Sequence, residues 1–183
     1  MNAKDLLGKK IIDKNARDLA KLAEIEINVK TFTIAKIYGS TGNPLSKKYY
    51  DIGANDILAV GDYIQVSKTI ETLEEEILDK IPESEEKIVK INNLIGKTVL
   101  DSEGNVTGKV SNVDINLNNF KIENISISSS SSSFGISKEE KTCTQDDITS
   151  IGDYIIINKT LTKKEEESEE TGESKDSVNV DIE

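Results

Sequence analysis

A stretch of fourteen residues occurs twice, in similar form, in this chain of 183 residues. Residues 56–69 return as residues 147–160, and eight of the fourteen positions are identical: Asp, Ile, Gly, Asp, Tyr, Ile, Lys and Thr. A second pair of similar blocks lies upstream, at residues 6–13 and 94–101. The offset is 88 residues for the upstream pair and 91 residues for the downstream pair. Two blocks that recur in the same order predict one fold used twice.

The repeat divides the chain into two units with acidic segments between and after them. We expect one unit at residues 1–70, a linker at residues 71–90, a second unit at residues 91–161 and a disordered tail at residues 162–183. The net charge of −11 comes from the linker (−5) and the tail (−6), whereas the two units carry +3 and −3. Such an acidic chain repels polyanions, which argues against nucleic acid as its partner. Units of opposite charge can also attract each other, so self-association is a further expectation.

The apolar pattern indicates a β-rich fold. Apolar residues alternate with polar ones over several short segments, and turn residues separate these segments. We expect strands at residues 9–13, 24–29, 31–38, 48–52, 63–66, 98–101, 109–117, 120–128, 141–144 and 154–158. At an offset of 88 residues, the apolar positions of residues 25–37 fall on apolar positions of residues 113–125. Short strands in units of about 70 residues predict two small closed barrels, because closure removes exposed sheet edges.

Two segments favour helix instead. Residues 15–23 carry good helix formers and predict a short helical turn in the first unit. In the linker, four apolar residues share one helical face before Pro82 ends the pattern: Leu73, Ile77, Leu78 and Ile81. A short amphipathic helix and a solvated linker remain alternatives for this segment.

The residue content argues against an enzyme. The chain has no histidine and one cysteine, which removes histidine-based catalysis and histidine or thiolate zinc sites within one chain. We therefore expect no catalytic residue, no cofactor and no metal site. Asp146 and Asp147 are a weak cation candidate, since adjacent strand residues face opposite ways. Cys143 aligns with Ile52, which predicts a core position.

The location follows from two absences. No apolar run approaches the length of a membrane span, and the first residues have no signal-peptide core. A lone cysteine suits a reducing compartment. We expect a cytoplasmic protein without direct membrane insertion.

The repeated motif resembles the PRC-barrel family. The second unit carries it most completely, as Leu-x-Gly-Lys-x-Val-x-Asp-x-x-Gly-x-x-x-Gly-Lys-Val and then Asp-Ile-x-x-x-Gly-Asp-Tyr-Ile; its glycines are Gly96, Gly104, Gly108 and Gly152. The first unit departs from the motif at Ala16 and Ala20, so its first hairpin is less well specified. The resemblance covers about 140 of the 183 residues and implies small β-barrels.

The resemblance also implies a role. Members of this family act as adaptors, and the stand-alone archaeal members include cell-division adaptors that bind SepF. We expect a non-enzymatic adaptor of the archaeal division machinery with a SepF-like protein partner. The alternative is a ribosome-associated or RNA-associated assembly factor similar to RimM, which would use the basic residues of the first unit: Lys9, Lys10, Lys14, Arg17, Lys47 and Lys48.

The recurring motif residues have structural interpretations. We expect Gly8 and Gly96 to permit the entry bend, and Gly61 and Gly152 to adopt positive φ or allow a close backbone approach. Asp62 and Asp153 are expected to accept hydrogen bonds from nearby backbone N–H groups. Tyr63 and Tyr154 are expected to start a strand and to bury their rings.

Two further segments lie outside the motif. Residues 128–133 are six serines, which predict a flexible hairpin tip. Residues 177–183 alternate apolar and polar residues, with Val178, Val180 and Ile182 on one side. Such a segment suits strand addition to the exposed sheet edge of a partner, although an unbound tail is the simpler alternative.

Overall fold

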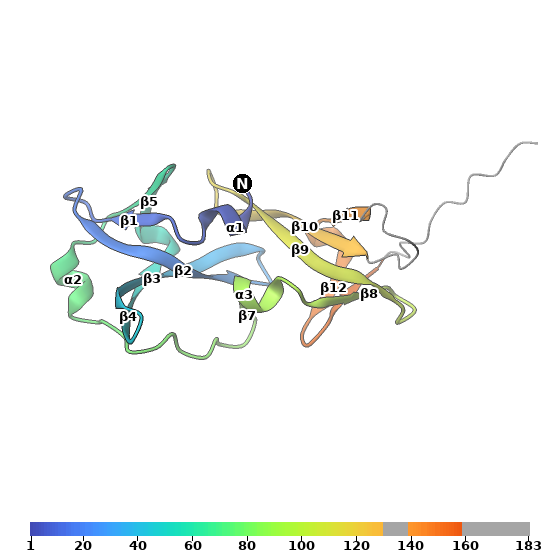
Figure 1. Cartoon of the computed structure of the whole chain (residues 1–183). Helices are drawn as coiled ribbons and strands as arrows, with labels where there is room; N and C mark the ends of the chain where they lie inside the picture. Colours follow the sequence, from blue (N-terminus) through green and yellow to red (C-terminus); the bar gives the residue numbers. More distant parts are fainter. Residues whose placement is uncertain (130–138, 159–183) are drawn as a thin grey trace, which may run out of the picture.

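The computed structural model describes residues 1–129 and 139–158 of the chain, and its fold is mostly β (Figure 1). The first half, residues 1–66, opens with a single helical turn whose N-cap is the Asn2 side chain. Its elements are α1 (Ala3–Leu6), β1 (Lys10–Ile12), β2 (Asp18–Asn28), β3 (Thr33–Asn43), β4 (Ser46–Gly53), the 3-10 turn η1 (Ala54–Asp56), β5 (Ile57–Val60) and β6 (Tyr63–Val66).

The second half, residues 88–158, follows a short connecting helix, α2 (Ile70–Glu74). It begins with a strand, β7 (Ile88–Lys90), and then runs through elements in the same order as the first half. These are α3 (Ile91–Leu94), β8 (Thr98–Leu100), β9 (Val106–Asn116), β10 (Lys121–Ser129), β11 (Glu139–Cys143), the 3-10 turn η2 (Gln145–Asp147), β12 (Ile148–Ile151) and β13 (Ile155–Ile157). Each strand expected from the sequence overlaps one of these strands.

The strand pairing recurs as well. In the first half β1 pairs in parallel with β6 and antiparallel with β2, and in the second half β8 pairs in parallel with β13 and antiparallel with β9. The described strands form one sheet with the order β12-β13-β8-β9-β10-β3-β2-β1-β6-β5, to which β4, β7 and β11 add at β3, β2 and β10. The path ends at β12 and at β5, so the sheet is open. The expectation of two closed barrels is therefore wrong for the described strands, because the halves join through β3 and β10 instead of each closing on itself.

The first residues of each half pair with a long strand of the other half. Ile115 in β9 exchanges two backbone hydrogen bonds of 2.8 Å with Met1. In the same way β7 pairs antiparallel with β2, where Val89 lies opposite Ile27. Residues 1 and 89, like residues 27 and 115, are 88 positions apart, so the two exchanges are equivalent.

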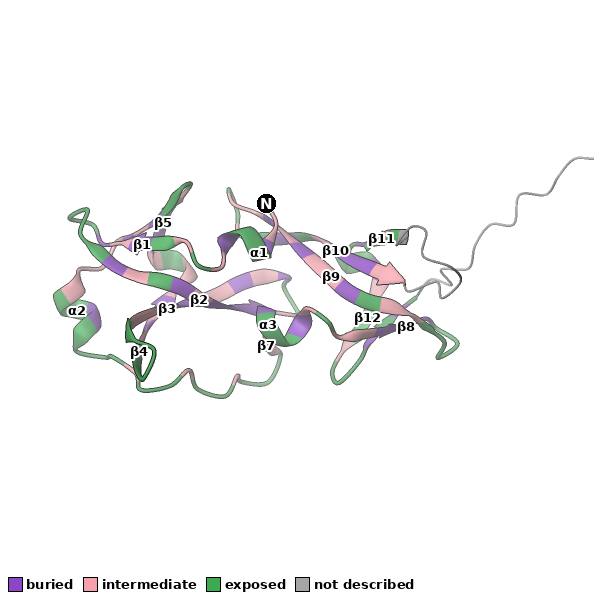
Figure 2. Ribbon diagram, viewed as in Figure 1, coloured by how far each residue is buried: buried purple, intermediate pink, exposed green. Residues whose placement is uncertain are grey.

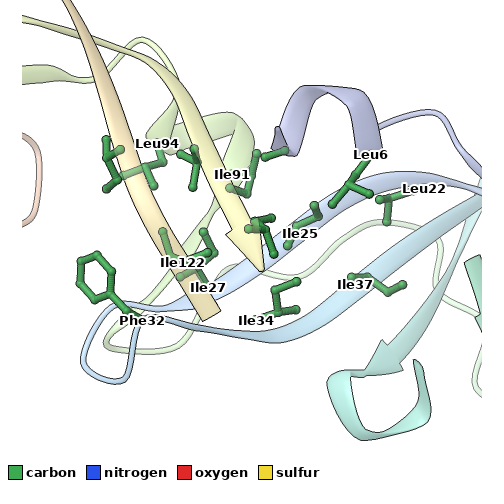
Figure 3. Close-up of a cluster of buried hydrophobic side chains, with 14 of the residues drawn as sticks. Leu6, Leu22, Ile25, Ile27, Phe32, Ile34, Ile37, Ile91, Leu94 and Ile122 are labelled. Carbon is green, nitrogen blue, oxygen red and sulfur yellow. The ribbon is translucent and has the colours of Figure 1, made fainter. Parts of the chain in front are cut away.

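The buried side chains form one core that spans both halves (Figure 2). Figure 3 shows Ile91 and Ile122 of the second half beside Ile27 and Ile34 of the first. α1 packs against β9 and α3 packs against β2, so each helix covers the long strand of the opposite half. The apolar stripe of each half is thus completed by the other half.

The expected helical turn is wrong for residues 18–23, and the linker helix, one of two alternatives for its segment, is shorter than its apolar pattern. Residues 18–23 belong to β2 rather than to a helical turn, because ladder bonds to β1 and β3 outweigh a weak helical preference. In the connecting segment the helix ends after Glu74, although its pattern continues to Ile81. Leu78 instead forms a β-bridge with Tyr49, whose N–H donates to the Leu78 carbonyl at 2.8 Å. The last residues of the expected linker form β7.

Candidate functional site

The two halves meet at a pair of equivalent turns. The Ile34 N–H donates to the Phe120 carbonyl at 2.8 Å, and the Ile122 N–H donates to the Phe32 carbonyl at 2.8 Å. Phe32 and Phe120 both lie in the left-handed region, with φ of +53° and +55°. This conformation is unusual for an aromatic residue. The reciprocal bonds relate the halves by an approximate two-fold axis, which creates two equivalent positions at the junction.

One of these positions is an open groove of about 650 Å³. One wall is β12 with the first two residues of η2, and the other wall is the turn after β2 together with the residue before β7. We call this site the junction groove, and its lining residues are Val29, Lys30, Phe32, Lys87, Gln145, Asp146, Ile148, Thr149, Ser150 and Ile151.

The equivalent position on the other side of the junction is packed shut. There Ile57 and Val60 of β5 lie against Leu117 and Phe120, around a cavity of only about 10 Å³. Ile148, Ile151, Val29 and Phe32 hold the matching positions in the junction groove. Similar apolar residues therefore close one site and leave the other open.

The two sites also differ in polarity. The middle of β12 is Thr149 and Ser150, where β5 has Leu58 and Ala59. In the junction groove, Gln145 Nε2 donates to the Lys30 carbonyl at 3.4 Å, which is the one hydrogen bond found across it among the described residues. Lys30 and Lys87 lie on the wall opposite β12. The groove thus combines an apolar floor, a polar strand, the two positive charges of Lys30 and Lys87, and the exposed carboxylate of Asp146.

β12 is an edge strand of the sheet. It pairs with β13 on one side, and it ends the order of the described strands on the other. An edge strand presents unpaired backbone N–H and C=O groups to whatever lies beside it. Since all four residues of β12 line the junction groove, the groove can accept an extended chain by backbone pairing.

The glycines of the first motif block have special backbone conformations. Gly8 and Gly96 both have φ of +85°, at the entry to β1 and β8. Gly104 has φ of +86° in the turn before β9, where Ala16 keeps φ of +59° in the first half. Gly108 lies so close to the backbone of Ser128 that a β-carbon would overlap its carbonyl oxygen.

The Gly-Asp-Tyr block, at residues 61–63 and 152–154, has a backbone and an exposure that differ from the sequence expectations. Gly61 and Gly152 do not have positive φ, and no other atom within 4 Å would meet a β-carbon there. Tyr63 and Tyr154 are 49% and 55% exposed, so the expectation of buried rings is wrong. The short hairpin turns carry these tyrosines on the surface, away from the core.

The aspartates of this block are also not turn-forming acceptors. In the part of the chain that the structure describes, the carboxylates of Asp62 and Asp153 accept no hydrogen bond. The turns instead depend on their backbone, since the N–H of Gly61 and of Gly152 each donates to the tyrosine carbonyl two residues on, at 2.9 Å.

Two buried aspartates, which the sequence reading left without a role, organise equivalent turns. Asp13 Oδ1 accepts from the N–H groups of Asn15 and Arg17 at 2.8 and 2.9 Å. Asp101 Oδ1 accepts from Glu103 and Asn105 at 2.9 and 2.8 Å. Burial raises the pKa of Asp13, but hydrogen bonds from Arg17 and its neighbours outweigh it and lower that pKa to about 2. Backbone donation from Asn105 likewise lowers the pKa of Asp101. The sequence did contain a signal for this role, because Asp13 and Asp101 recur 88 positions apart in the two units.

The two aspartates of the acidic pair, Asp146 and Asp147, lie in different surroundings. Asp147 is buried, and its Oδ2 accepts from the Thr144 N–H and Oγ1 at 2.9 and 3.1 Å as the cap of η2. Asp146 is exposed. Among residues 1–129 and 139–158, no three histidine, cysteine, aspartate or glutamate side chains are grouped as a metal site would require. Cys143 is 1% exposed, in the core as expected.

Several expectations fall on undescribed parts of the chain. The tail at residues 162–183, with Val178, Val180 and Ile182, lies outside the described residues, as do four of the six serines, residues 130–133. In the described part, no helix is both long and apolar enough to traverse a lipid bilayer.

Comparison with protein families assigns the second half. Residues 86–162 match the PRC-barrel domain. The match begins two residues before β7 and includes β12 and the wall of the junction groove that carries it. A search among curated proteins found no match to the chain.

Proposed function

We propose that the protein is a non-enzymatic adaptor that binds an extended segment of a protein partner in the junction groove. The observation that carries the proposal is the open groove along edge strand β12, at a position whose equivalent beside β5 is packed shut. The open position has room for a second chain.

The chemistry of the groove favours a β-strand as its occupant. A strand added beside β12 gains backbone hydrogen bonds, and alternate side chains reach the apolar floor formed by Val29, Phe32 and Ile151. Lys30 and Lys87 favour acidic residues near the ends of that strand. Lys87 contacts Glu86 at 3.4 Å, an exposed pair that contributes little and can be exchanged for another.

We infer that the two halves are two copies of one PRC-type unit, with residues 1–85 as the copy that has diverged further. The support is the shared order of elements, the two parallel pairings of the first strand with the last, and the reciprocal exchange of Met1 and Val89. Two copies in one chain can differ in sequence. The groove beside β12 can therefore stay open for a partner while the matching position beside β5 is closed.

The resemblance to archaeal division adaptors makes a SepF-like protein the first partner to test. Calorimetric titration of SepF from the same organism into the full chain is expected to give binding. Thr149→Arg, an exposed change on β12, should weaken it at least about tenfold, or 1.4 kcal/mol. The matched change Leu58→Arg on β5 should leave it unaltered.

The outcomes separate the partner from the site. No heat with SepF would remove that partner, and equal loss in both arginine variants would remove the junction groove as the place of binding.

The RimM-like alternative has less support. Of the six basic residues it would use, three are held in ion pairs: Lys10 with Asp18, Arg17 with Asp13 and Glu71, and Lys48 with Asp79. Neutralised side chains release few counterions from a phosphate backbone. A gel shift with ribosomal RNA at low salt would revive this alternative.

A further inference from the structure

We propose that residues 178–182 of this same chain occupy the junction groove as an added strand beside β12 when no partner is bound. The inference rests on the proposed function, because the partner and this segment would share one groove. It adds a regulatory consequence, since a partner must then displace the segment.

The first argument is reach. β13 ends at Ile157, and β13 is the neighbour of β12 in the sheet. A strand on the far side of β12 lies two strand spacings from β13, or about 10 Å. Residues 159–177 form a connection of 19 residues. A flexible connection of that length spans about 24 Å on average. The segment can therefore reach the groove of its own chain without strain.

The second argument is the side-chain pattern. Val178, Val180 and Ile182 alternate with Asn179 and Asp181, so one face of an extended segment is apolar and the other is polar. The groove presents an apolar floor over the length of the four-residue strand β12. Three apolar side chains at this spacing match a strand of that length.

The third argument is charge. Asp181 and Glu183 flank Ile182, and residues 162–183 together carry a net charge of −6. Lys30 and Lys87 form the wall opposite β12. An acidic segment is thus attracted to this wall.

Two other sheet edges, at β5 and β4, fit the segment less well. Beside β5 the equivalent position is filled by Leu117 and Phe120, and β4 is bridged at Tyr49 by Leu78. The junction groove, in contrast, is open along β12 and apolar at its floor. A short tether raises the effective concentration of the segment to the millimolar range, so even a weak strand contact would be populated.

The test is hydrogen exchange of the full chain, read by mass spectrometry on the peptide that contains residues 148–151. Replacing Val178, Val180 and Ile182 by Asp should speed exchange in β12 at least about tenfold, a loss of 1.4 kcal/mol. The matched control, Asn179→Ala, changes an uncharged polar position of the segment and should leave the exchange rate unchanged. Thr149→Arg should also speed exchange in β12, whereas Leu58→Arg should not.

Each outcome decides the inference. Equal exchange in the full chain and in the triple-Asp variant would overturn it. Protection that grows with protein concentration would also overturn it, because the segment would then bind a second copy. If the segment protects β12 but SepF binds neither the full chain nor a chain ending at residue 161, the partner fails and the inference stands. If SepF binds both chains equally tightly while the triple-Asp change has no effect, the inference alone fails.

Discussion

Gly108 and Gly39 show how the two halves solve one packing problem in opposite ways. In the second half Gly108 of β9 faces Ile127 of β10, and a β-carbon on Gly108 would meet the Ile127 side chain. In the first half the matching positions are Ala20 and Gly39, and there a β-carbon on Gly39 would meet Ala20. The small residue has moved to the opposite strand. The loss of the motif glycine at position 20 is therefore compensated within the same strand pair.

The first prediction concerns Gly108→Ala. The new β-carbon would overlap the Ser128 carbonyl oxygen, so we expect the free energy of unfolding in urea to fall by about 1–3 kcal/mol. Gly152→Ala is the control, because nothing within 4 Å would meet its β-carbon and its φ is not positive. The control should change stability by no more than about 0.5 kcal/mol. Similar losses for both variants would show that the close contact at Gly108 does not exist.

The second prediction concerns pH and Asp13. Its folded pKa of about 2 lies below the ordinary 3.8, so its contribution to stability is present above that ordinary value and is lost as pH falls toward 2. Asp13→Asn should lower the urea midpoint clearly at pH 6, and the difference from the unaltered chain should shrink below pH 4. Asp62→Asn, at an exposed residue, is the control and should have little effect at either pH. A gap for Asp13→Asn that is constant from pH 6 to pH 2.5 would contradict the account.

At the residue scale the sequence predicted special backbone at Gly8 and Gly96, where φ is positive, because glycine adopts positive φ at no steric cost. The positive φ expected as one possibility at Gly61 and Gly152 is absent.

The sequence did not predict positive φ at Phe32 and Phe120. The residue type alone does not favour that conformation. In the first half the Phe32 N–H closes the turn locally on the Asn28 carbonyl at 2.8 Å, and the carbonyls of Phe32 and Phe120 accept from the other half. The bonds to the other half are visible only once the halves are together.

At the element scale, the long strands were predicted from the sequence, whereas the short strands β5, β7 and β12 were not. β2, β3, β9 and β10 alternate over nine or eleven residues, which gives a strong period of two. β5 and β12 have four residues each, with two exposed positions in the middle, and β7 has three residues inside an acidic segment. The junction groove was missed for this reason, since its walls are β12 and the approach to β7.

The third prediction tests the exchanged strand β7. Val89 is half-buried against the core and lies opposite Ile27 of the first half. Val89→Asp should lower the free energy of unfolding by about 1–2 kcal/mol and should speed amide exchange in β2. Leu45→Asp, at a fully exposed apolar residue, should change neither quantity. Faster exchange confined to residues 88–158 would contradict the pairing with β2.

At the scale of the whole molecule, the exchange makes the halves interdependent. Each long central strand, β2 or β9, is covered by a segment that belongs to the other half, and one core contains side chains from both. Neither half on its own has a complete core. The junction groove has the same origin, because its two walls come from different halves.

The fourth prediction follows for separated halves. A fragment of residues 1–82 and one of residues 83–183 should each show weak β structure by circular dichroism, and mixing them should restore it in a 1:1 complex by sedimentation. Two folded monomers that do not associate would contradict the exchange.

The most direct test of the shared core is differential scanning calorimetry of the intact chain. The account predicts one transition, with a calorimetric enthalpy about equal to the van't Hoff enthalpy, because the halves cannot unfold separately. Two resolved transitions, or a calorimetric enthalpy about twice the van't Hoff value, would contradict it.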